Sequence, residues 1–380
     1  MFFEHVPTEV ILFFILYGIT GVVPLVAAVY LLLGRSNVFA PDVTPPVRLR
    51  RWAASVFAAS AVSHVWWYLF YMYSRDYYSV WYMLVVVFDF VGILTTIAAT
   101  LLAMLQDRKR PIWPTFIAMV PFVVIMLLQH ICSDDSFIQI GISYNLSLYV
   151  LFSAYMVFAV RRYGRWLNDN YADLENKNVW LSQAVSLAFL LLSIIYTVVD
   201  VHSKLLYFLH FVELLFYGLL LWRVETLPQL DSNLSPAPSP KEKGVFAVDL
   251  VKIERLLKEH CEDTQLYLQH DLSLQQLAQT VGTNRFYLSQ YFSRHGITYN
   301  TYINNLRINH FINRYQELAV SRQPVVAQQL AQESGYRSYS TFGRAFMQRM
   351  GQSVTAWMRE TGGVNADPAC SRQFDDFDGD

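Results

Sequence analysis

The sequence is poor in cysteine and in charged residues. Its three cysteines, Cys132, Cys261 and Cys370, lie far apart and form no Cys-x-x-Cys pair or Cys/His cluster, which argues against a disulfide framework and a structural zinc site. Charged residues make up 16% of the chain and hydrophobic residues 54%. Soluble domains average about 25% charged residues, so this composition predicts a membrane part.

The sequence also lacks the local motifs of common catalytic centres. It contains no nucleophile elbow, no glycine-rich phosphate loop and no Cys/His pair. We therefore expect no catalytic residue, no metal and no cofactor, and a chain that is not an enzyme.

Long hydrophobic runs fill the first 225 residues. Each has close to the roughly 17–25 apolar residues that a membrane-spanning helix needs. The first run is preceded by no Lys or Arg and shows no small-residue cleavage pattern, so we interpret it as a retained span rather than a signal peptide. The sequence predicts seven spans, at residues 10–33, 52–73, 79–105, 112–131, 138–160, 179–199 and 205–222.

Positive charges in the connecting loops predict the orientation of these spans. One alternating set of loops carries only Arg75 and Lys204. Because Lys and Arg accumulate in cytoplasmic loops, the N-terminus is expected outside a bacterial inner membrane and the C-terminus in the cytoplasm. The other set of loops carries eleven positive charges: Arg35, Arg48, Arg50, Arg51, Arg108, Lys109, Arg110, Arg161, Arg162, Arg165 and Lys177.

The chain beyond the seventh span divides into three parts. Residues 226–245 are rich in Pro and Ser and are expected to form an extended linker. Residues 246–361 regain helical periodicity, and residues 362–380 form an acidic tail that we expect to be disordered. The predicted fold class is therefore all-α, with a seven-helix membrane bundle in residues 1–225 and a separate helical domain at 246–361.

Two helix-turn-helix units are predicted in that helical domain. In the first, Ser273 and Asn284 can cap two short helices, and Gly282 can end the first of them. Apolar residues recur there with helical spacing, and the pattern returns about fifty residues later around Gly335 and Phe342. The residues that form the apolar faces are Leu274, Leu277, Ala278, Val281, Leu288, Tyr291 and Phe292 in the first unit, and Val326, Leu330, Ala331, Phe342, Ala345 and Phe346 in the second.

Across residues 272–359 the sequence resembles the AraC/XylS family of transcription regulators. The resemblance implies sequence-specific DNA binding, with the second helix of each unit in successive major grooves. It departs from the family pattern at Phe311, Val354 and Arg359. The matching residues are Leu277-Ala278, Val281-Gly282, Asn284, Tyr287-Leu288-Ser289, Phe292, Gly296, Tyr302-Ile303-Asn304-Asn305-Leu306-Arg307, Leu330-Ala331, Ser334-Gly335-Tyr336, Ser338, Ser340, Phe342-Gly343-Arg344-Ala345-Phe346 and Gly351.

The charge of this region agrees with a DNA partner. Residues 272–359 contain nine Arg and two Glu, a net charge of 9 − 2 = +7. Carried over position by position, the resemblance implies base reading by Phe286, Ser289, Gln290, Tyr339, Ser340 and Arg344, and phosphate contacts by Arg285, Arg294 and Arg349. Two alternatives stay open from the residues alone. Arg294 and Arg349 could instead be solvated helix positions, and Phe286 could instead belong to the core.

Four ionisable residues are predicted inside spans. His64, Asp89, His210 and Glu213 fall at similar depths on three spans, and ionisable groups in a membrane are costly enough to suggest function. We hypothesise a pocket that senses a small polar or cationic ligand from outside or from the membrane. It would be lined by the aromatic residues Trp66, Trp67, Tyr68 and Tyr71. A polar network that only fixes helix packing is the alternative.

A second function is also open. Ser60, His64, Asp89 and His210 are similar to the zinc constellation of seven-span ceramidase-like hydrolases, although a second histidine four positions from His210 is absent unless Glu213 replaces it. We expect instead a membrane-anchored transcription regulator whose partners are promoter DNA, the lipid bilayer and a small ligand. The sequence leaves open whether it acts as a homodimer.

Overall fold

The computed structural model describes residues 8–361 except 35, 74–75, 77–78, 197–202, 231–249 and 322. Within this part of the chain every regular element is a helix, as the sequence predicts, and β pairing is limited to one isolated bridge between Tyr171 and Ser273. Most of the expected linker and the whole acidic tail lie outside the described residues.

The chain forms two compact units, which we describe separately. The membrane unit comprises Met1–Tyr163 and Asn176–Ser232, and the C-terminal unit comprises Gly164–Glu175 and Asn233–Asp380. The short segment Gly164–Glu175, which the sequence placed with the membrane spans, therefore groups with the C-terminal unit. Helix α7 runs through the boundary between them.

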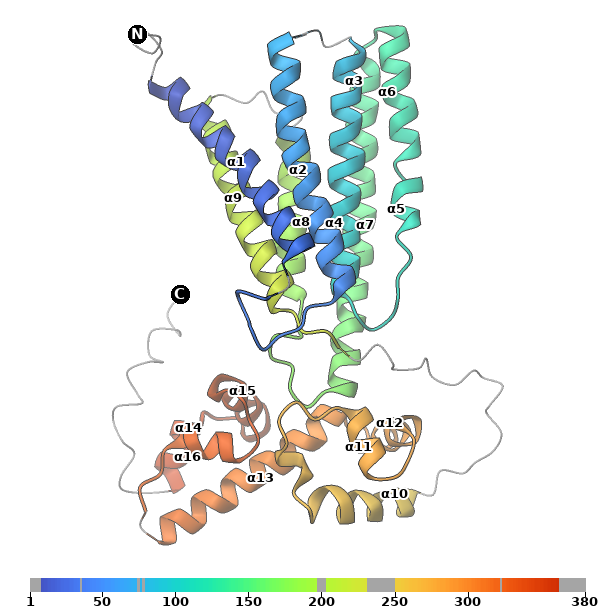
Figure 1. The fold of residues 1–380 in the computed structure, drawn as a ribbon. Coiled ribbons are helices and arrows are strands. Elements are labelled where there is room, and N and C mark those ends of the chain that lie inside the picture. Colours follow the sequence, from blue (N-terminus) through green and yellow to red (C-terminus); the bar gives the residue numbers. More distant parts are fainter. Residues whose placement is uncertain are drawn as a thin grey trace, which may run out of the picture. The chain divides into compact units, whose positions relative to one another are not determined.

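Long helices make up the membrane unit (Figure 1). Six stretches of the described chain are long and apolar enough to cross a membrane, and the helix at Trp180–Ile194 is shorter. The helices are α1 (Thr8–Leu33), α2 (Val47–Tyr73), α3 (Val80–Val87), the π-helical η1 (Phe88–Ile93), α4 (Leu94–Met104), α5 (Trp113–Ile117), α6 (Val120–Cys132), α7 (Ser136–Asn170), α8 (Trp180–Tyr196) and α9 (Ser203–Thr226).

Two predicted spans are not uniform helices. The third consists of α3, η1 and α4 in direct succession, so a π-helical segment interrupts it. The fourth is divided into α5 and α6, because Pro121 lies in the first turn of α6, where its missing N–H favours a new helix start. Helix α7 continues ten residues past the expected end of the fifth span, to Asn170.

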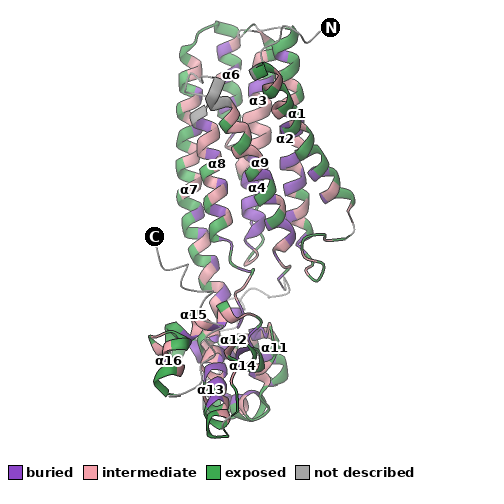
Figure 2. Ribbon diagram, turned by 90° about the vertical axis from the view of Figure 1, so that its left-hand side faces the viewer, coloured by how far each residue is buried: buried purple, intermediate pink, exposed green. Residues whose placement is uncertain are grey.

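Small residues allow α1 and α2 to pack closely. Ala28 on α1 and Ala53 on α2 are buried, and a Cβ added at Gly21 would lie 3.4 Å from His64 Cβ. Small residues at such contacts let helix backbones approach in lipid, where no hydrophobic effect drives helices together. Figure 2 shows exposed residues on the outer sides of the membrane helices, and large apolar side chains such as Val26 and Phe158 are among them.

The C-terminal unit contains two cores joined by one long helix. Tyr299 and Ile303 of this helix, α13, pack in the first core, and Phe311 and Tyr315 pack in the second. The departure from the family pattern at Phe311 is therefore a core packing position. The helices are α10 (Leu250–Leu257), η3 (Lys258–Glu262), η4 (Leu266–Leu268), α11 (Leu274–Thr280), α12 (Arg285–Arg294), α13 (Tyr299–Val320), α14 (Ala327–Glu333), α15 (Tyr339–Met350) and α16 (Val354–Thr361).

Candidate DNA interface and membrane cluster

The first helix-turn-helix unit consists of α11 and α12. Ser273 Oγ accepts from Gln276 N, and Gln276 Oε1 accepts from Ser273 N at 2.8 Å, so the two residues form a capping box. Gly282 has φ +70°, which an L side chain rarely adopts. Asn284 Oδ1 accepts from Phe286 N at 2.9 Å and begins α12. These caps confirm the start and stop signals in the sequence.

The second unit consists of α14 and α15. Ser338 caps α15, and Phe342 and Phe346 are completely buried beneath it. Gly335, between the two helices, has φ +91°, and a Cβ there would lie 2.8 Å from Leu268 O. The expectation that Val326 belongs to the apolar face of this unit is wrong. Val326 is 58% exposed, because it is the N-cap of α14 and precedes the turn that faces the core.

Most predicted DNA-contacting residues lie at the surface. Phe286 is 37% exposed, so the alternative that it belongs to the core is wrong. Tyr339 is half-buried, and its ring lies 5.8 Å from that of Phe342. Arg285 and Gln290 are also half-buried, whereas the exposed residues are Phe286, Ser289, Arg294, Ser340, Arg344 and Arg349.

Two of the predicted phosphate-binding arginines are held by other side chains or backbone of the same unit. Arg349 donates to Asn305 O at 2.5 Å and to Asn309 Oδ1 at 2.6 Å, which fixes it against α13. Arg285 Nε donates to Asn170 Oδ1 at 2.9 Å. Among the described contacts, Arg344 donates only within its own helix, to Ser340 O at 3.4 Å. Of the three arginines, its guanidinium group is therefore the best placed to reach out to DNA.

Arg307 does not contribute to a DNA-binding surface. It is completely buried in α13 and donates to Tyr267 O at 2.7 Å and to Gln269 O at 2.8 Å. Its Nη1 lies 3.0 Å from Asp173 Oδ1, and that carboxylate is itself buried. A buried charge is tolerated when it is paired and fully hydrogen-bonded. One of the nine arginines counted in residues 272–359 is thus buried and does not face a DNA partner.

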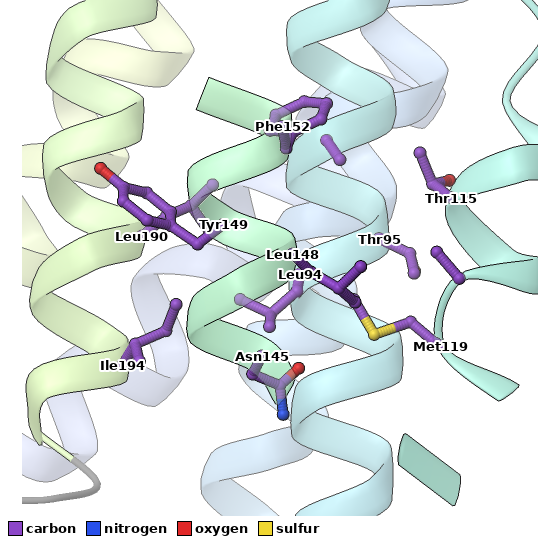
Figure 3. Close-up of a pocket in the computed structure, with 12 residues that line it drawn as sticks. Leu94, Thr95, Thr115, Met119, Asn145, Leu148, Tyr149, Phe152, Leu190 and Ile194 are labelled. Carbon is purple, nitrogen blue, oxygen red and sulfur yellow. The ribbon is translucent and has the colours of Figure 1, made fainter. Parts of the chain in front are cut away.

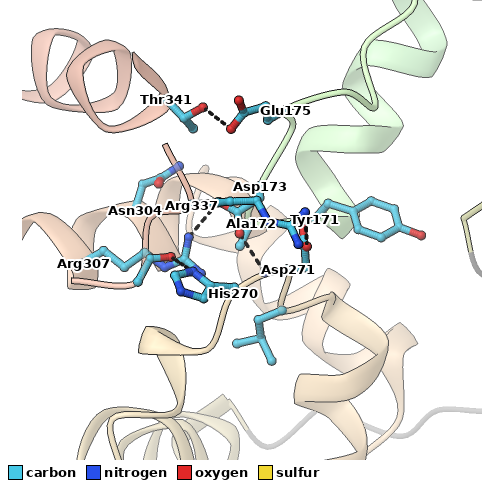
Figure 4. A network of polar contacts seen from close by, with 12 residues as sticks. Tyr171, Ala172, Asp173, Glu175, His270, Asp271, Asn304, Arg307, Arg337 and Thr341 are labelled. Atoms are coloured by element: carbon cyan, nitrogen blue, oxygen red, sulfur yellow. Dashed lines mark hydrogen bonds and ion pairs between the residues drawn. The ribbon is translucent and has the colours of Figure 1, made fainter. Parts of the chain in front are cut away.

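Residues Asn170–Glu175, which we call the docking segment, attach to the C-terminal unit (Figure 4). Ala172 N donates to Leu272 O at 3.2 Å, and Ala172 packs into the first core. Asn300 Nδ2 donates to Ala172 O at 2.6 Å. Asp173 accepts from Asp271 N at 2.9 Å with the oxygen that Arg307 does not use. The segment is therefore part of the fold of this unit.

The docking segment also reaches the start of α15. Glu175 Oε2 accepts from Ser338 Oγ at 2.7 Å and from Thr341 Oγ1 at 3.1 Å. Sequence reasoning missed Asp173 and Glu175, because acidic residues in a short polar loop look like ordinary solvated residues. Only their contacts with residues far along the chain distinguish them.

In the membrane unit, three of the four predicted ionisable residues meet. One ligand-type atom from each of His64, His210 and Glu213 lies within 4.8 Å of the others. Glu213 Oε2 lies 3.8 Å from His64 Nε2 and 3.4 Å from His210 Nδ1. Thr20 Oγ1 on α1 lies 3.0 Å from His64 Nε2 and 3.4 Å from His210 Nδ1. We call His64, His210 and Glu213 the polar cluster.

Asp89 lies outside the polar cluster. It belongs to the π-helical segment η1, and Trp67 Nε1 donates to its Oδ2. The expected aromatic lining is also wrong in part, because Tyr68 and Tyr71 are 45% and 51% exposed on α2. The rings beside the two histidines come instead from α1: Tyr17 lies 5.0 Å from His64 and 5.6 Å from His210.

Two further residues hold the polar cluster in place. Tyr217 OH donates to Glu213 Oε1, and His64 Nδ1 lies 2.9 Å from Ser60 O. Sequence reasoning missed Thr20 and Tyr217, although the i+4 spacing of Glu213 and Tyr217 on one helix was a usable signal. Ser60, a member of the hydrolase-like pattern, contributes its backbone oxygen here.

The membrane unit also contains a small apolar cavity of about 100 Å³, which shares no residue with the polar cluster (Figure 3). Its most polar lining group is Asn145, whose Nδ2 donates to Gly141 O at 3.1 Å. Side chains of α4, α5, α7 and α8 line it together with Met119. Ligand sites are usually about 300–1,000 Å³, so this volume fits a packing gap between helices better than a ligand site.

Comparison with known proteins identifies one domain. A family of helix-turn-helix domains matches residues 277–360, which supports the AraC-type domain that the sequence predicts. No curated protein and no solved structure matches the chain. The C-terminal part is thus a helix-turn-helix domain of the kind found in DNA-binding transcription regulators, and it follows helices that can span a membrane.

Proposed function

We propose that the protein is a transcription regulator anchored in the bacterial inner membrane, which binds promoter DNA sequence-specifically in the cytoplasm. The observation that supports this best is the pair of capped helix-turn-helix units on one chain with several membrane-spanning helices. In this proposal seven helices cross the membrane, α8 being the short one.

The docking segment supports the orientation. It connects α7 to α8 and contacts helices of the DNA-binding unit, so both must lie on the same side of a membrane. The positive charges of the loops independently favour a cytoplasmic position for that connection.

In the proposed complex α12 and α15 enter successive major grooves, roughly 34 Å apart along the DNA. Arg344 reads a guanine, since an arginine can donate to both O6 and N7 of that base. Phe286, Ser289, Gln290, Tyr339 and Ser340 contact other base edges. Arg285, Arg294 and Arg349 contact phosphates.

The membrane unit acts in this proposal as the sensor. Three ionisable side chains converge on one point between helices, where burial makes them costly unless they serve a purpose. Two of them lie on α9, the helix that continues towards the DNA-binding unit.

The test is DNA binding by the full-length protein in detergent or nanodiscs. Affinity for its own promoter should fall steeply with salt. Arg344→Ala should weaken the specific site by about 1–3 kcal/mol and reduce discrimination at one base pair. Arg314→Ala is the matched control, because Arg314 is an exposed arginine of α13 paired with Glu317. Equal losses on specific and unrelated DNA would reassign Arg344 to phosphate, and no DNA binding at all would refute the proposed function.

A further inference from the structure

We propose that the polar cluster is a binding site for a divalent metal cation of the zinc type, and that this cation is the input of the sensor. The role of the cation as a signal rests on the proposed function, whereas the metal site itself does not. Its ligands would be His64 Nε2, His210 Nδ1 and Glu213 Oε2.

The spacing of these atoms suits a tetrahedral ion. Metal–ligand bonds of about 2.0–2.1 Å place neighbouring tetrahedral ligands about 3.4 Å apart. His210 Nδ1 and Glu213 Oε2 are 3.4 Å apart, and His64 Nε2 and Glu213 Oε2 are 3.8 Å apart. Small side-chain rotations would bring all three atoms into one coordination shell. Thr20 Oγ1 or water would occupy the fourth position.

Hydrogen bonds on the outer side of the cluster prepare two ligands. A carbonyl oxygen only accepts, so the contact of His64 Nδ1 with Ser60 O places the proton on Nδ1. In the neutral ring Nε2 then carries a lone pair, and this atom lies 3.0 Å from Thr20 Oγ1 and 3.8 Å from Glu213 Oε2. Tyr217 OH holds the other oxygen of Glu213. Metal-binding histidines and carboxylates are commonly oriented by partners of this kind.

The ligand set selects the ion. Two imidazoles and one carboxylate favour zinc and its neighbours in the first transition row over calcium or magnesium, which prefer oxygen ligands throughout. The side chains are only 12% (His64), 13% (His210) and 20% (Glu213) exposed. A cation there would offset the cost of burying the carboxylate.

Metal binding would also join two helices. His64 lies on α2, whereas His210 and Glu213 lie on α9. An ion shared by them fixes α9 relative to α2, and a shift of α9 would move the start of the expected linker that leads to the DNA-binding unit.

The experiment uses full-length protein in detergent, stripped with a chelator and titrated with Co²⁺ as a probe, then with Zn²⁺. We expect one Co²⁺ per chain with the intense visible absorption of four-coordinate cobalt, displaced by Zn²⁺. His210→Ala and Glu213→Gln should abolish the band. Tyr217→Phe should weaken affinity about 10- to 100-fold, the usual effect of losing a partner of a ligand. His130→Gln on α6 is the control histidine and should bind normally.

A single symmetric peak in size-exclusion chromatography and the helical content of the wild-type protein by circular dichroism show that the variants are folded. Absence of the band in the wild-type protein, or a band unchanged in His210→Ala, overturns the metal site while leaving the DNA result intact. Metal binding without any DNA binding instead refutes the proposed function and keeps the site.

A separate observation carries a second inference: we infer that the docking segment competes with DNA for the recognition helices. The segment contacts the first turns of both recognition helices. Asn170 accepts a hydrogen bond from Arg285 of α12, and Glu175 accepts from Ser338 and Thr341 at the start of α15. In helix-turn-helix proteins the N-terminal residues of the recognition helix meet the DNA. Glu175 therefore places a carboxylate where a helix start would attract phosphate.

The two acidic residues of the docking segment are held to different degrees. Asp173 is buried against Arg307, whereas Glu175 is half-buried and pairs only with hydroxyl groups among its described contacts. DNA can thus displace Glu175 without extracting Asp173. Because the segment directly follows α7, movement of that helix would change how firmly Glu175 is held.

The test is Glu175→Gln in the full-length protein. Removing the carboxylate should tighten promoter binding about 2- to 5-fold, as expected for one charge at a helix start. Glu317→Gln, an exposed carboxylate on α13, is the control and should change affinity less. Unchanged or weaker binding by Glu175→Gln overturns competition. Failure of the wild-type protein to bind DNA would instead refute the proposed function on which this inference rests.

Discussion

At the scale of residues, Asp173 and Arg307 show how one buried pair can decide the stability of a domain. Both side chains are buried, and Arg307 gives all its described hydrogen bonds to the interior. Asp173→Ala would leave the guanidinium charge unpaired, which costs about 3–5 kcal/mol. Chemical unfolding of the full-length protein, followed through the C-terminal unit, measures the loss.

Glu317→Ala serves as the comparison for this prediction. It breaks the ion pair with Arg314. The side chains of Arg314 and Glu317 are 43% and 61% exposed, and such surface pairs contribute about 0–1 kcal/mol to stability. Similar losses in the two variants would contradict a buried, structural role for Asp173.

The cysteines provide a second test at this scale. Burial raises the pKa of Cys261 to about 12, so the thiolate that reacts with maleimide is scarce below that pH. Cys132 is exposed at the end of α6, on the side expected outside the cell. In intact cells a membrane-impermeant maleimide at pH 8 should label Cys132. After the cells are opened, the same reagent should leave Cys261 unmodified.

Cys132→Ser should abolish that labelling, which assigns the signal to one residue. Persistent labelling of Cys132→Ser, or labelling of Cys132 only after the cells are opened, would reverse the proposed orientation and place the DNA-binding unit outside the cytoplasm.

At the scale of elements, the turn before α15 depends on a single glycine. Gly335→Ala combines a positive φ with a Cβ 2.8 Å from Leu268 O, where backbone cannot yield easily. We expect a loss of at least about 1–3 kcal/mol in stability and a loss of promoter binding, because α15 can no longer pack in its native orientation. Thermal unfolding and a DNA-binding assay measure the two effects.

Gly343 on α15 is the matched control. A Cβ there meets nothing within 4 Å and φ is helical, so Gly343→Ala should stabilise the helix by about 0.5–1 kcal/mol. Equal behaviour of the two variants would show that the conformation of Gly335 is not required.

At the scale of the whole molecule, the division into units changes what an isolated DNA-binding fragment should do. A fragment beginning near Gly244 is predicted from sequence to be soluble and to bind DNA. It lacks Asp173 and Ala172, however, and leaves Arg307 without its carboxylate. We expect such a fragment to unfold at a lower temperature than the same unit in the full-length protein.

Adding a peptide of residues 164–175 should raise the unfolding temperature of the fragment, since a ligand that binds only the folded state stabilises it. The same peptide with Asp173→Asn should have a smaller effect. If both peptides act equally, or neither acts, the docking segment is not a specific part of this unit.

Local patterns in the sequence predicted most of the elements. Helix starts depend on neighbouring residues, so the caps at Ser273 and Asn284 and the positive φ of Gly282 were predictable. Hydrophobic run length predicted the positions of the long apolar helices. The helix-turn-helix domain was recognisable because its signals are short and repeated.

The sequence by itself determined the all-helical class, the caps and turns of the helix-turn-helix domain, and which polar residues fall on the long apolar helices, because each depends on near neighbours or on composition. The tertiary structure decided which distant residues meet. It brought His64, His210 and Glu213 together without Asp89, buried Arg307, one of the nine arginines in the net charge, in the core, and joined residues 170–175 to a unit about a hundred positions later. Such contacts follow from how helices pack in space, and no local spacing encodes them.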